Sequence, residues 1–415
     1  MPRLSRRALL AALATTAGCA GVPGAGPNGT PTGSDTHSFP PPPPTSAAPR
    51  SPTPLPTDTE WPQRGNTPDR RGRLDGTATP EEPSLGWSFF SRLSTPVVAD
   101  GTLYAVERNR DSLLVARDAA TGRQQWAVEL GGEAAAVPAV GDGRLYVQRY
   151  TAMEAYDPGG DGRLWRTDFG GGGPTPPAVV DGDVYAAQGE LQTPSSVASF
   201  APDGTERWLV ELDGEVRAPP AVADGTVVVA SDAGVLHGFS TDGESVWEVD
   251  VASGSESGPA LAAGTAFLLD TDGLVRAVDV ADGSVGWTAD VGVEPDGRTT
   301  PAVTEDAVIV PGNEAVVCLE RADGSKRWRF GVPRGSATTP AVDDAAVYVG
   351  ETGSEARIYA LDLADGTERW HRRTEDKGIS DVIASGIGGP PTLVEGGAYV
   401  VAADGIRAFG RDDSG

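Results

Sequence analysis

Two cysteines and three histidines are the side chains in this sequence best suited to metal binding or nucleophilic chemistry. The cysteines are Cys19 and Cys318, and the histidines are His37, His237 and His371. Two distant cysteines cannot form a disulfide framework, and no Cys/His cluster has the spacing of a zinc site. The histidines are too few to propose a catalytic triad. We therefore predict no catalytic residue and no metal ligand.

Aspartates recur in Asp-Gly pairs along the chain, which raises the question of calcium. Carboxylates are the hard oxygen ligands that calcium prefers, but no EF-hand-like spacing occurs. Aspartate before glycine bonds to local backbone in tight turns. We therefore interpret these pairs as turn chemistry, and we expect no cofactor.

Tryptophans recur at intervals of 39 to 43 residues, which indicates a repeat architecture. They are Trp87, Trp126, Trp165, Trp208, Trp247, Trp287, Trp328 and Trp370. In the first unit, turn signals at 100–101 and 121–122 help to separate four predicted strands. These strands are 95–99, 102–107, 113–118 and 124–130. Four short antiparallel strands at a period near 40 residues are typical of a propeller blade.

The repeat closes at eight units. Seven units run from a proline to a tryptophan, whereas the last, 391–409, has three strands and no tryptophan. Trp87 lies in a strand that follows no such unit. We predict that this N-terminal strand is the outer strand of the last blade, which removes a free sheet edge. The predicted fold is an all-β, eight-bladed propeller of four-stranded antiparallel blades over residues 84–410.

His237 and Cys318 each fall at a regular position of the repeat. The position of His237 is shared with valine, arginine and tyrosine in other units, so we interpret it as an ordinary strand position. Cys318 stands where other units carry alanine or glycine. A thiol at such a position is most simply a packed core residue.

The N-terminal sequence resembles an export signal. Residues 1–19 combine basic residues, including Arg6 and Arg7, with an apolar run too short to span a bilayer. The run around Arg6 and Arg7 resembles a twin-arginine signal, and 16–19 resembles a lipobox with Cys19 as the lipidated residue. The alternative is an ordinary signal peptide cut elsewhere. Residues 20–60 are rich in proline, threonine and serine and predict a disordered tether, 61–83 form an entry segment, and 411–415 are a tail.

The charge balance excludes one class of function. The net charge is −26, and only two of the 33 basic residues are lysine. A sequence-independent nucleic-acid binder needs many Lys/Arg–phosphate contacts, so we expect no nucleic-acid partner. An acidic, lysine-poor surface suits solubility in concentrated salt, which indicates a halophilic archaeal source.

The repeat resembles the unit of the pyrroloquinoline-quinone (PQQ)-type propeller family, whose pattern is TPAVxDGxVYVGSxDGxLYALDAxTGxxxW. The most similar copies are residues 339–370 and 95–126. The motif Trp-Pro-Gln-Arg-Gly-Asn at 61–66 resembles the entry segment of lipoprotein relatives, including BamB-type outer-membrane assembly factors. The resemblance implies that the repeat tryptophans dock between adjacent blades.

The same family includes quinone-dependent alcohol and glucose dehydrogenases. These enzymes share a vicinal disulfide, a calcium set of Glu, Asn and Asp, and a catalytic Asp. This chain has no Cys-Cys pair. We expect no cofactor, and binding of PQQ with calcium is the alternative hypothesis.

Two connections in each unit vary in length: the second turn, and the link from the tryptophan strand to the next unit. Neighbouring strands of a blade alternate in direction, so both connections lie on one face, the variable face. The first and third turns lie on the opposite face, the Asp-Gly face. Variable loops on a rigid scaffold usually carry binding sites.

Several arginines precede inner strands, and with Arg372 and Arg373 they predict a cationic ring at the channel mouth. Such a ring would attract a carboxylate-bearing ligand or peptide. The alternative is that each arginine pairs with a nearby acid. The candidate residues are Arg92, Arg108, Arg110, Gln188, Glu190, Gln192, Arg217, Arg298, Arg334, His371, Arg372 and Arg373.

We expect an exported, lipid-anchored monomer on the outer face of the cytoplasmic membrane. There it would be a non-catalytic scaffold for a protein or a small acidic ligand. The alternatives are a PQQ-dependent alcohol or sugar dehydrogenase and an extracellular sensory or binding module.

Overall fold

A computed structural model describes residues 59–410 except 77, 82, 109–110, 132–134, 191–192, 252–253, 256, 296–298, 354–355 and 375–385. The side chains of residues 190, 193 and 334 are also outside the description. The described residues belong to one compact unit, Ser51–Gly415. Its regular elements are all β-strands. Among the described residues, no helix is long and apolar enough to cross a membrane.

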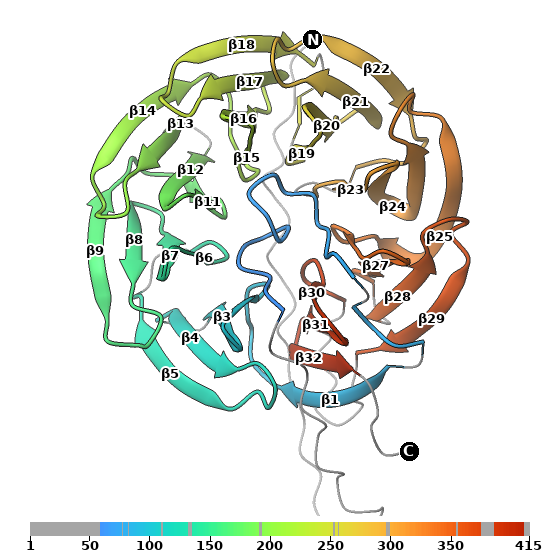
Figure 1. The fold of residues 1–415 in the computed structure, drawn as a ribbon, viewed down its shortest axis with the longest axis horizontal. Helices are drawn as coiled ribbons and strands as arrows, with labels where there is room; N and C mark the ends of the chain where they lie inside the picture. The colour runs from blue at the N-terminus through green and yellow to red at the C-terminus, as the bar shows by residue number, and fades with distance from the viewer. Residues whose placement is uncertain are drawn as a thin grey trace, which may run out of the picture. The chain divides into compact units, whose positions relative to one another are not determined.

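Eight antiparallel sheets surround a central axis, which confirms the predicted propeller (Figure 1). Blade 1 holds β2 (Val97–Ala99), β3 (Thr102–Glu107), β4 (Leu113–Asp118) and β5 (Gln124–Glu129), and blade 2 holds β6 (Ala139–Gly141), β7 (Arg144–Gln148), β8 (Ala152–Tyr156) and β9 (Arg163–Asp168). Blade 3 holds β10 (Gly173–Pro174), β11 (Ala178–Val180), β12 (Asp183–Glu190), β13 (Thr193–Phe200) and β14 (Glu206–Leu212), and blade 4 holds β15 (Ala221–Ala223), β16 (Thr226–Ala230), β17 (Val235–Ser240) and β18 (Ser245–Asp250).

The second half of the ring repeats this order from the axis outward. Blade 5 holds β19 (Ala260–Ala262), β20 (Thr265–Leu269), β21 (Leu274–Asp279) and β22 (Val285–Asp290), and blade 6 holds β23 (Ala302–Val303), β24 (Ala307–Glu320) and β25 (Lys326–Ser336). Blade 7 holds β26 (Ala341–Val342), β27 (Ala346–Gly350), β28 (Arg357–Asp362) and β29 (Glu368–Arg373), and blade 8 holds β30 (Thr392–Val394), β31 (Gly397–Ala402), β32 (Gly405–Gly410) and β1 (Ser84–Phe89).

Blade 6 contains three assigned strands because its second and third strands run together as β24. The chain has a positive φ of 59° at Glu314 in the middle of β24. The amide of Arg321, just after β24, donates to the carbonyl of Asp306, just before it, at 2.8 Å. The two ends of β24 therefore meet, and β24 folds as a hairpin.

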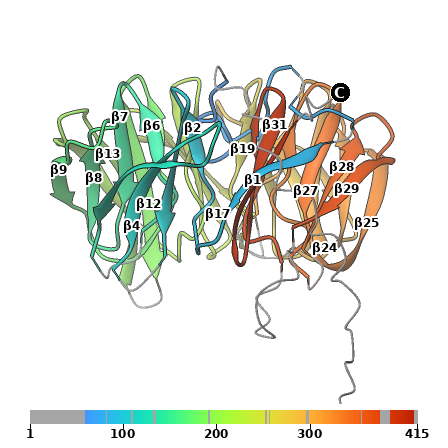
Figure 2. The ribbon, with the colours of Figure 1, turned by 90° about the horizontal axis from the view of Figure 1, so that it is seen from below.

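Burial follows strand position within a blade. The second and third strands are packed on both faces, so β3 is apolar from Leu103 to Val106 and almost entirely buried. The outer strand covers the blade on one side only, and β5 alternates between exposed and half-buried residues. This difference is expected when one sheet face is packed and the other meets water. Figure 2 shows the blades edge-on, with strands running between the two faces of the ring.

The N-terminal strand closes the ring as predicted. β1 pairs antiparallel with β32, from Ser84 opposite Gly410 to Phe89 opposite Ile406. The guanidinium of Arg117 in blade 1 lies 3.4 Å from the centroid of the Phe89 ring, so β1 also packs on the next blade.

Replacing Ser84–Phe89 with a Gly/Ser linker of equal length is expected to expose the edge of β32 and to remove the buried Trp87. We expect a loss of at least about 3 kcal/mol in the free energy of unfolding. An open strand edge also promotes association. Thermal melts and size-exclusion chromatography measure both effects, and an unchanged melting temperature with an unchanged elution volume would show that β1 does not hold the ring closed.

Seven repeat tryptophans connect neighbouring blades. In each, the indole Nε1 donates to a backbone carbonyl about one repeat later, as from Trp126 to Pro158 at 2.9 Å and from Trp208 to Thr241 at 2.8 Å. The other donors are Trp87, Trp165, Trp247, Trp287 and Trp328. These rings pack on the glycine of the third turn in the next blade. Gly243 shows the fit, since an added Cβ would lie 2.5 Å from the Trp208 ring.

Residues 59–76, which we call the strap, cross the centre of the ring and are drawn in blue in Figure 1. The strap pairs with innermost strands close to their Asp-Gly turns. Trp61 and Val98 exchange backbone hydrogen bonds of 2.8 and 2.9 Å in blade 1, and Leu74 donates to Val342 in blade 7 at 2.9 Å. The Asp-Gly end of the channel is therefore occupied by the chain itself.

Candidate functional site

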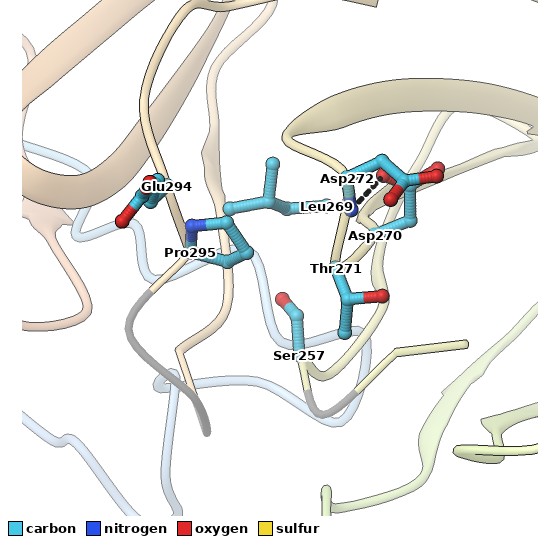
Figure 3. Close-up of a pocket in the computed structure, with 7 residues that line it drawn as sticks. All are labelled: Ser257, Leu269, Asp270, Thr271, Asp272, Glu294 and Pro295. Atoms are coloured by element: carbon cyan, nitrogen blue, oxygen red, sulfur yellow. Dashed lines mark hydrogen bonds between the residues drawn. The ribbon is translucent and has the colours of Figure 1, made fainter. Parts of the chain in front are cut away.

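Two cavities lie on the variable face of blades 5 and 6. The first has a volume of about 480 Å³ (Figure 3). Its lining residues are Ser257, Leu269, Asp270, Thr271, Asp272, Glu294 and Pro295. They come from the second turn of blade 5 and from the links before and after that blade. These are the connections that the sequence predicts to vary.

The second cavity has a volume of about 460 Å³ and shares Glu294 with the first. It is lined by Gly292, Val293, Glu294, Asn313, Glu314, Arg329, Gly335 and Ser336. Because Glu294 lines both cavities, they are neighbours on one surface. We call the two cavities together the trough.

The trough has an acidic rim. Asp270 is fully buried and pairs with Arg276 at 3.0 Å, so its charge is neutralised within the blade. It also accepts the amide of Asp272 at 3.0 Å, which fixes the turn that faces the cavity (Figure 3). Asp272, Glu294 and Glu314 are exposed. Among the lining residues that the structure describes, three exposed carboxylates and the exposed guanidinium of Arg329 give an excess of negative charge.

The predicted arginine ring is only partly described, and its described members do not assemble. Arg92 and Arg108 are exposed and adjacent on blade 1, where the amide of Arg108 donates to the carbonyl of Arg92 at 2.6 Å. Arg217 of blade 4 forms an ion pair with Glu215. This ion pair agrees with the alternative hypothesis, in which each arginine pairs with a nearby acid.

His371, Arg372 and Arg373 lie on β29, the outermost strand of blade 7. They are therefore at the rim of the ring, and the expectation that Arg372 and Arg373 surround the channel mouth is corrected. The strand continues three residues beyond Trp370, so these residues belong to the sheet and not to a loop. His371 contacts Glu368 at 2.7 Å, and Arg372 donates to the carbonyl of Pro83 at 3.0 Å.

Gln188 is 1% exposed, and its amide donates to the carbonyl of Phe169 at 2.9 Å. It supports the β12–β13 hairpin and offers no binding surface. The remaining candidates lie outside the described residues or have side chains outside the description: Arg110, Glu190, Gln192, Arg298, Arg334 and the lipidation candidate Cys19.

His237 and Cys318 are both strand residues inside blades. His237 on β17 is 5% exposed and lies 3.4 Å from Glu248, and burial lowers the pKa of its imidazole. Cys318 on β24 is fully buried in an apolar cluster with Ile309 and Val347. Burial raises the pKa of its thiol to about 12, so the thiol stays protonated and unreactive at neutral pH.

The sequence did not single out the trough acids, and it marked 61–83 as an entry segment without predicting that this segment crosses the hub. Asp272 sits in an ordinary Asp-Gly turn, and Glu294 sits in a link that carries no motif. Trp61 and Arg70 of the strap offered a better signal. They form a tryptophan- and arginine-containing stretch that belongs to no repeat unit yet precedes the folded ring.

The dehydrogenase resemblance implies a quinone and a calcium ion. At the Asp-Gly end the hub is filled by the strap, and Cys318 is enclosed in the core of blade 6. The described residues contain no group of three or more His, Cys, Asp or Glu side chains arranged to hold a metal ion.

Eight antiparallel blades, built on a repeat whose tryptophan lies in the outer strand, define a β-propeller of the PQQ-like repeat class. The chain belongs to the family described as outer membrane protein assembly factor BamB, whose model matches residues 69–155, 151–299 and 271–414.

Solved structures with the same fold come from different functional classes. BamB from Moraxella catarrhalis is 14% identical, with a TM-score of 0.63 over 80% of this chain and 100% of that chain. A quinohemoprotein alcohol dehydrogenase from Comamonas testosteroni is 13% identical, with a TM-score of 0.69 over 86% of this chain and 81% of that chain. At these identities the likeness establishes the fold alone.

A local similarity links the chain to a signalling protein. It is 29% identical over 128 residues to the serine/threonine-protein kinase AfsK of Streptomyces griseus. The match covers 28% of this chain and spans 16% of the length of the kinase.

Proposed function

We propose that this protein is a non-catalytic scaffold that binds an extended, basic segment of a partner protein in the trough. The observation that carries the proposal is the pair of cavities on the variable face that meet at Glu294. Two adjoining hollows suit an extended segment that places successive side chains in each. The exposed Asp272, Glu294 and Glu314 favour lysine and arginine in that segment.

Family membership supports the scaffold role, because the family is described as an outer membrane protein assembly factor. The net charge of −26 supports the choice of a basic partner, since a strongly negative protein attracts cations over long range. A basic segment replaces the acidic ligand that the arginine candidates suggested. The described arginines do not form a ring: Arg92 and Arg108 are adjacent on blade 1, whereas Arg217 is paired with Glu215. The trough acids Asp272, Glu294 and Glu314 are exposed.

The location of the protein is part of the same proposal. The twin-arginine-like and lipobox-like segments support export and a lipid anchor at Cys19, with the propeller held as a monomer at the outer face of the cytoplasmic membrane. The scarcity of lysine supports a high-salt habitat.

Charge reversal in the trough tests the binding proposal. The double variant Asp272→Lys/Glu294→Lys is expected to weaken binding of a fluorescent Lys/Arg-rich peptide at least about tenfold in an anisotropy titration, because like charges then face each other. The matched control is Glu206→Lys/Glu244→Lys. It makes the same charge change at exposed positions of blade 3 and blade 4, respectively. Equal weakening in both variants would mean that net charge alone attracts the peptide, and the trough would lose its role.

A second candidate is a sensory module. It is favoured by the similarity between 128 residues of this chain and part of a kinase. A dehydrogenase activity has only fold-level likeness in its favour. Robust turnover of an alcohol or a sugar with added PQQ, calcium and a dye acceptor would overturn the non-catalytic assignment.

A further inference from the structure

The strap bonds to the same backbone position in seven consecutive blades. At this position, two residues after the repeat proline, the backbone amide of the innermost strand donates to a strap oxygen. The seven donors are Val98, Val140, Val179, Val222, Leu261, Val303 and Val342. Their acceptors occur in sequence order: the carbonyls of Trp61 and Pro62, the side chain of Gln63, and the carbonyls of Pro68, Asp69, Arg71 and Gly72.

Blade 8 is contacted by the start of the strap, where the hydroxyl of Thr59 accepts the amide of Glu395 at 3.1 Å. The strap therefore contacts every blade once around the axis. An innermost strand has a free edge, and unpaired backbone amides there are costly unless they find a partner. The strap supplies that partner at equivalent points around the ring.

Arg70 lies at the centre of this arrangement. It is 2% exposed, and its guanidinium donates to the carbonyls of Pro220 at 3.0 Å, Pro176 at 2.9 Å and Arg64 at 2.5 Å. These carbonyls belong to blade 4, blade 3 and the strap itself. Burial lowers the pKa of Arg70 to about 9, with the charge of Arg64 as a second cause, so Arg70 remains charged at neutral pH.

We propose that residues 59–76 form a single releasable strap, with Arg70 as its latch, that closes the Asp-Gly end of the channel and holds the innermost strands of the blades in register. The channel is then blind, and solutes reach it only from the variable face. This inference does not depend on the trough or its ligand.

The way the strap is attached explains why it should release as one unit. It is held mainly by hydrogen bonds spread around the hub, with Trp61 and Leu74 as its large buried apolar side chains. Between them the chain makes a compact loop in which Gly72 donates to Gly65 at 3.0 Å and Asn66 donates to Arg73 at 2.6 Å. Freeing one segment of such a loop disturbs the others, so local opening is cooperative.

Hydrogen exchange of the full chain, resolved to single amides by mass spectrometry, tests the proposal. In the wild type, the seven donor amides are expected to share one protection factor. It should be lower than that of amides shared by second and third strands, such as β3 and β4. In Arg70→Met, all seven are expected to accelerate together by at least about tenfold, while the β3–β4 and β7–β8 ladders keep their protection. Arg70→Lys keeps the charge without the planar guanidinium. Exchange of the seven donor amides in this variant is expected to be intermediate between wild type and Arg70→Met.

Two results would overturn the strap. One is acceleration confined to Val179 and Val222, the donors in the two blades that Arg70 contacts directly. The other is a set of seven unrelated protection factors in the wild type. If Arg70→Met unfolds completely, the wild-type protection factors alone decide between one cooperative strap and independent contacts.

Discussion

Replacing Trp247 with alanine is expected to lower the free energy of unfolding by about 3–5 kcal/mol. The indole is 7% exposed and lies in an apolar cluster that joins blades 4 and 5, with Leu236 on one side and Val278 on the other. Its Nε1 donates to the carbonyl of Val280 at 2.7 Å. Alanine would leave a cavity between two blades and a buried carbonyl without its donor, and both effects destabilise the ring.

The neighbouring residue Val246 provides a matched control. It is 50% exposed on the same outer strand, so Val246→Ala is expected to change stability by no more than about 0.5 kcal/mol. Urea denaturation followed by tryptophan fluorescence measures both variants. If both substitutions lower the free energy of unfolding equally, Trp247 contributes no more stability than an exposed residue. The blades would then be joined by other contacts.

Replacing Glu154 with glutamine is expected to have a similarly large effect, a loss of about 3–5 kcal/mol at neutral pH. The Glu154 side chain is 1% exposed and lies 2.8 Å from Arg166, 3.0 Å from Arg163 and 3.3 Å from Arg149. Tyr156 donates to the same carboxylate at 2.6 Å. The substitution would leave the buried guanidinium of Arg149, only 3% exposed, without its carboxylate.

The pH dependence of this effect has a definite sign. Burial by itself raises the pKa of Glu154, but the hydrogen bonds from Tyr156 and Arg166 and the charges of Arg149 and Arg163 outweigh burial and hold it below its ordinary value of 4.5. A carboxylate with a depressed pKa stabilises the fold above pH 4.5 and loses that contribution as the pH falls through its folded pKa. The difference between wild type and Glu154→Gln should therefore shrink on acidification.

Asp183→Asn is the control for this prediction. Asp183 pairs with Arg207 at 2.7 Å, but the two side chains are 26% and 49% exposed, so the expected loss is below about 1 kcal/mol. Denaturation curves between pH 3 and pH 7 compare the variants. A cost for Glu154→Gln that stays constant over this range would show that the ionised carboxylate is not the source of its stability.

The blade framework was predictable because it is repeated. The strands expected in the first unit, such as 102–107 and 113–118, have the bounds of β3 and β4. Each copy of the repeat supports the placement of the others, so an error in one unit is corrected by its neighbours. The assignment of Trp87 to the last blade followed from the count alone and is confirmed by the pairing of β1 with β32.

The same regularity should have placed Arg372 and Arg373 correctly. The outer strand β5 runs three residues past Trp126 to Glu129, and β29 runs three residues past Trp370 to Arg373. The prediction treated these arginines as the start of a loop because the sequence that follows is long and irregular. The position of a strand end follows the repeat, whereas the length of the next loop does not affect it.

The position of the strap across the hub and the location of the trough could not be predicted from the sequence, for a physical reason. Arg70 acts through three backbone carbonyls, and carbonyls carry no side-chain signature. Glu294 lines one cavity with Asp272 and the other with Glu314, which come from the second turns of two successive blades. Such sites depend on which loops the ring brings together, and a single repeat unit does not contain that information.

The strap has a consequence for how this protein is made. The bond between Thr59 and Glu395 joins residues 336 positions apart, and it depends on blade 8, whose strands come from opposite ends of the ring sequence. Contacts of such long sequence separation slow folding, because loop closure must precede them. The hub and the eighth blade therefore form only after β32 has been synthesised, and the ring stays open until that point.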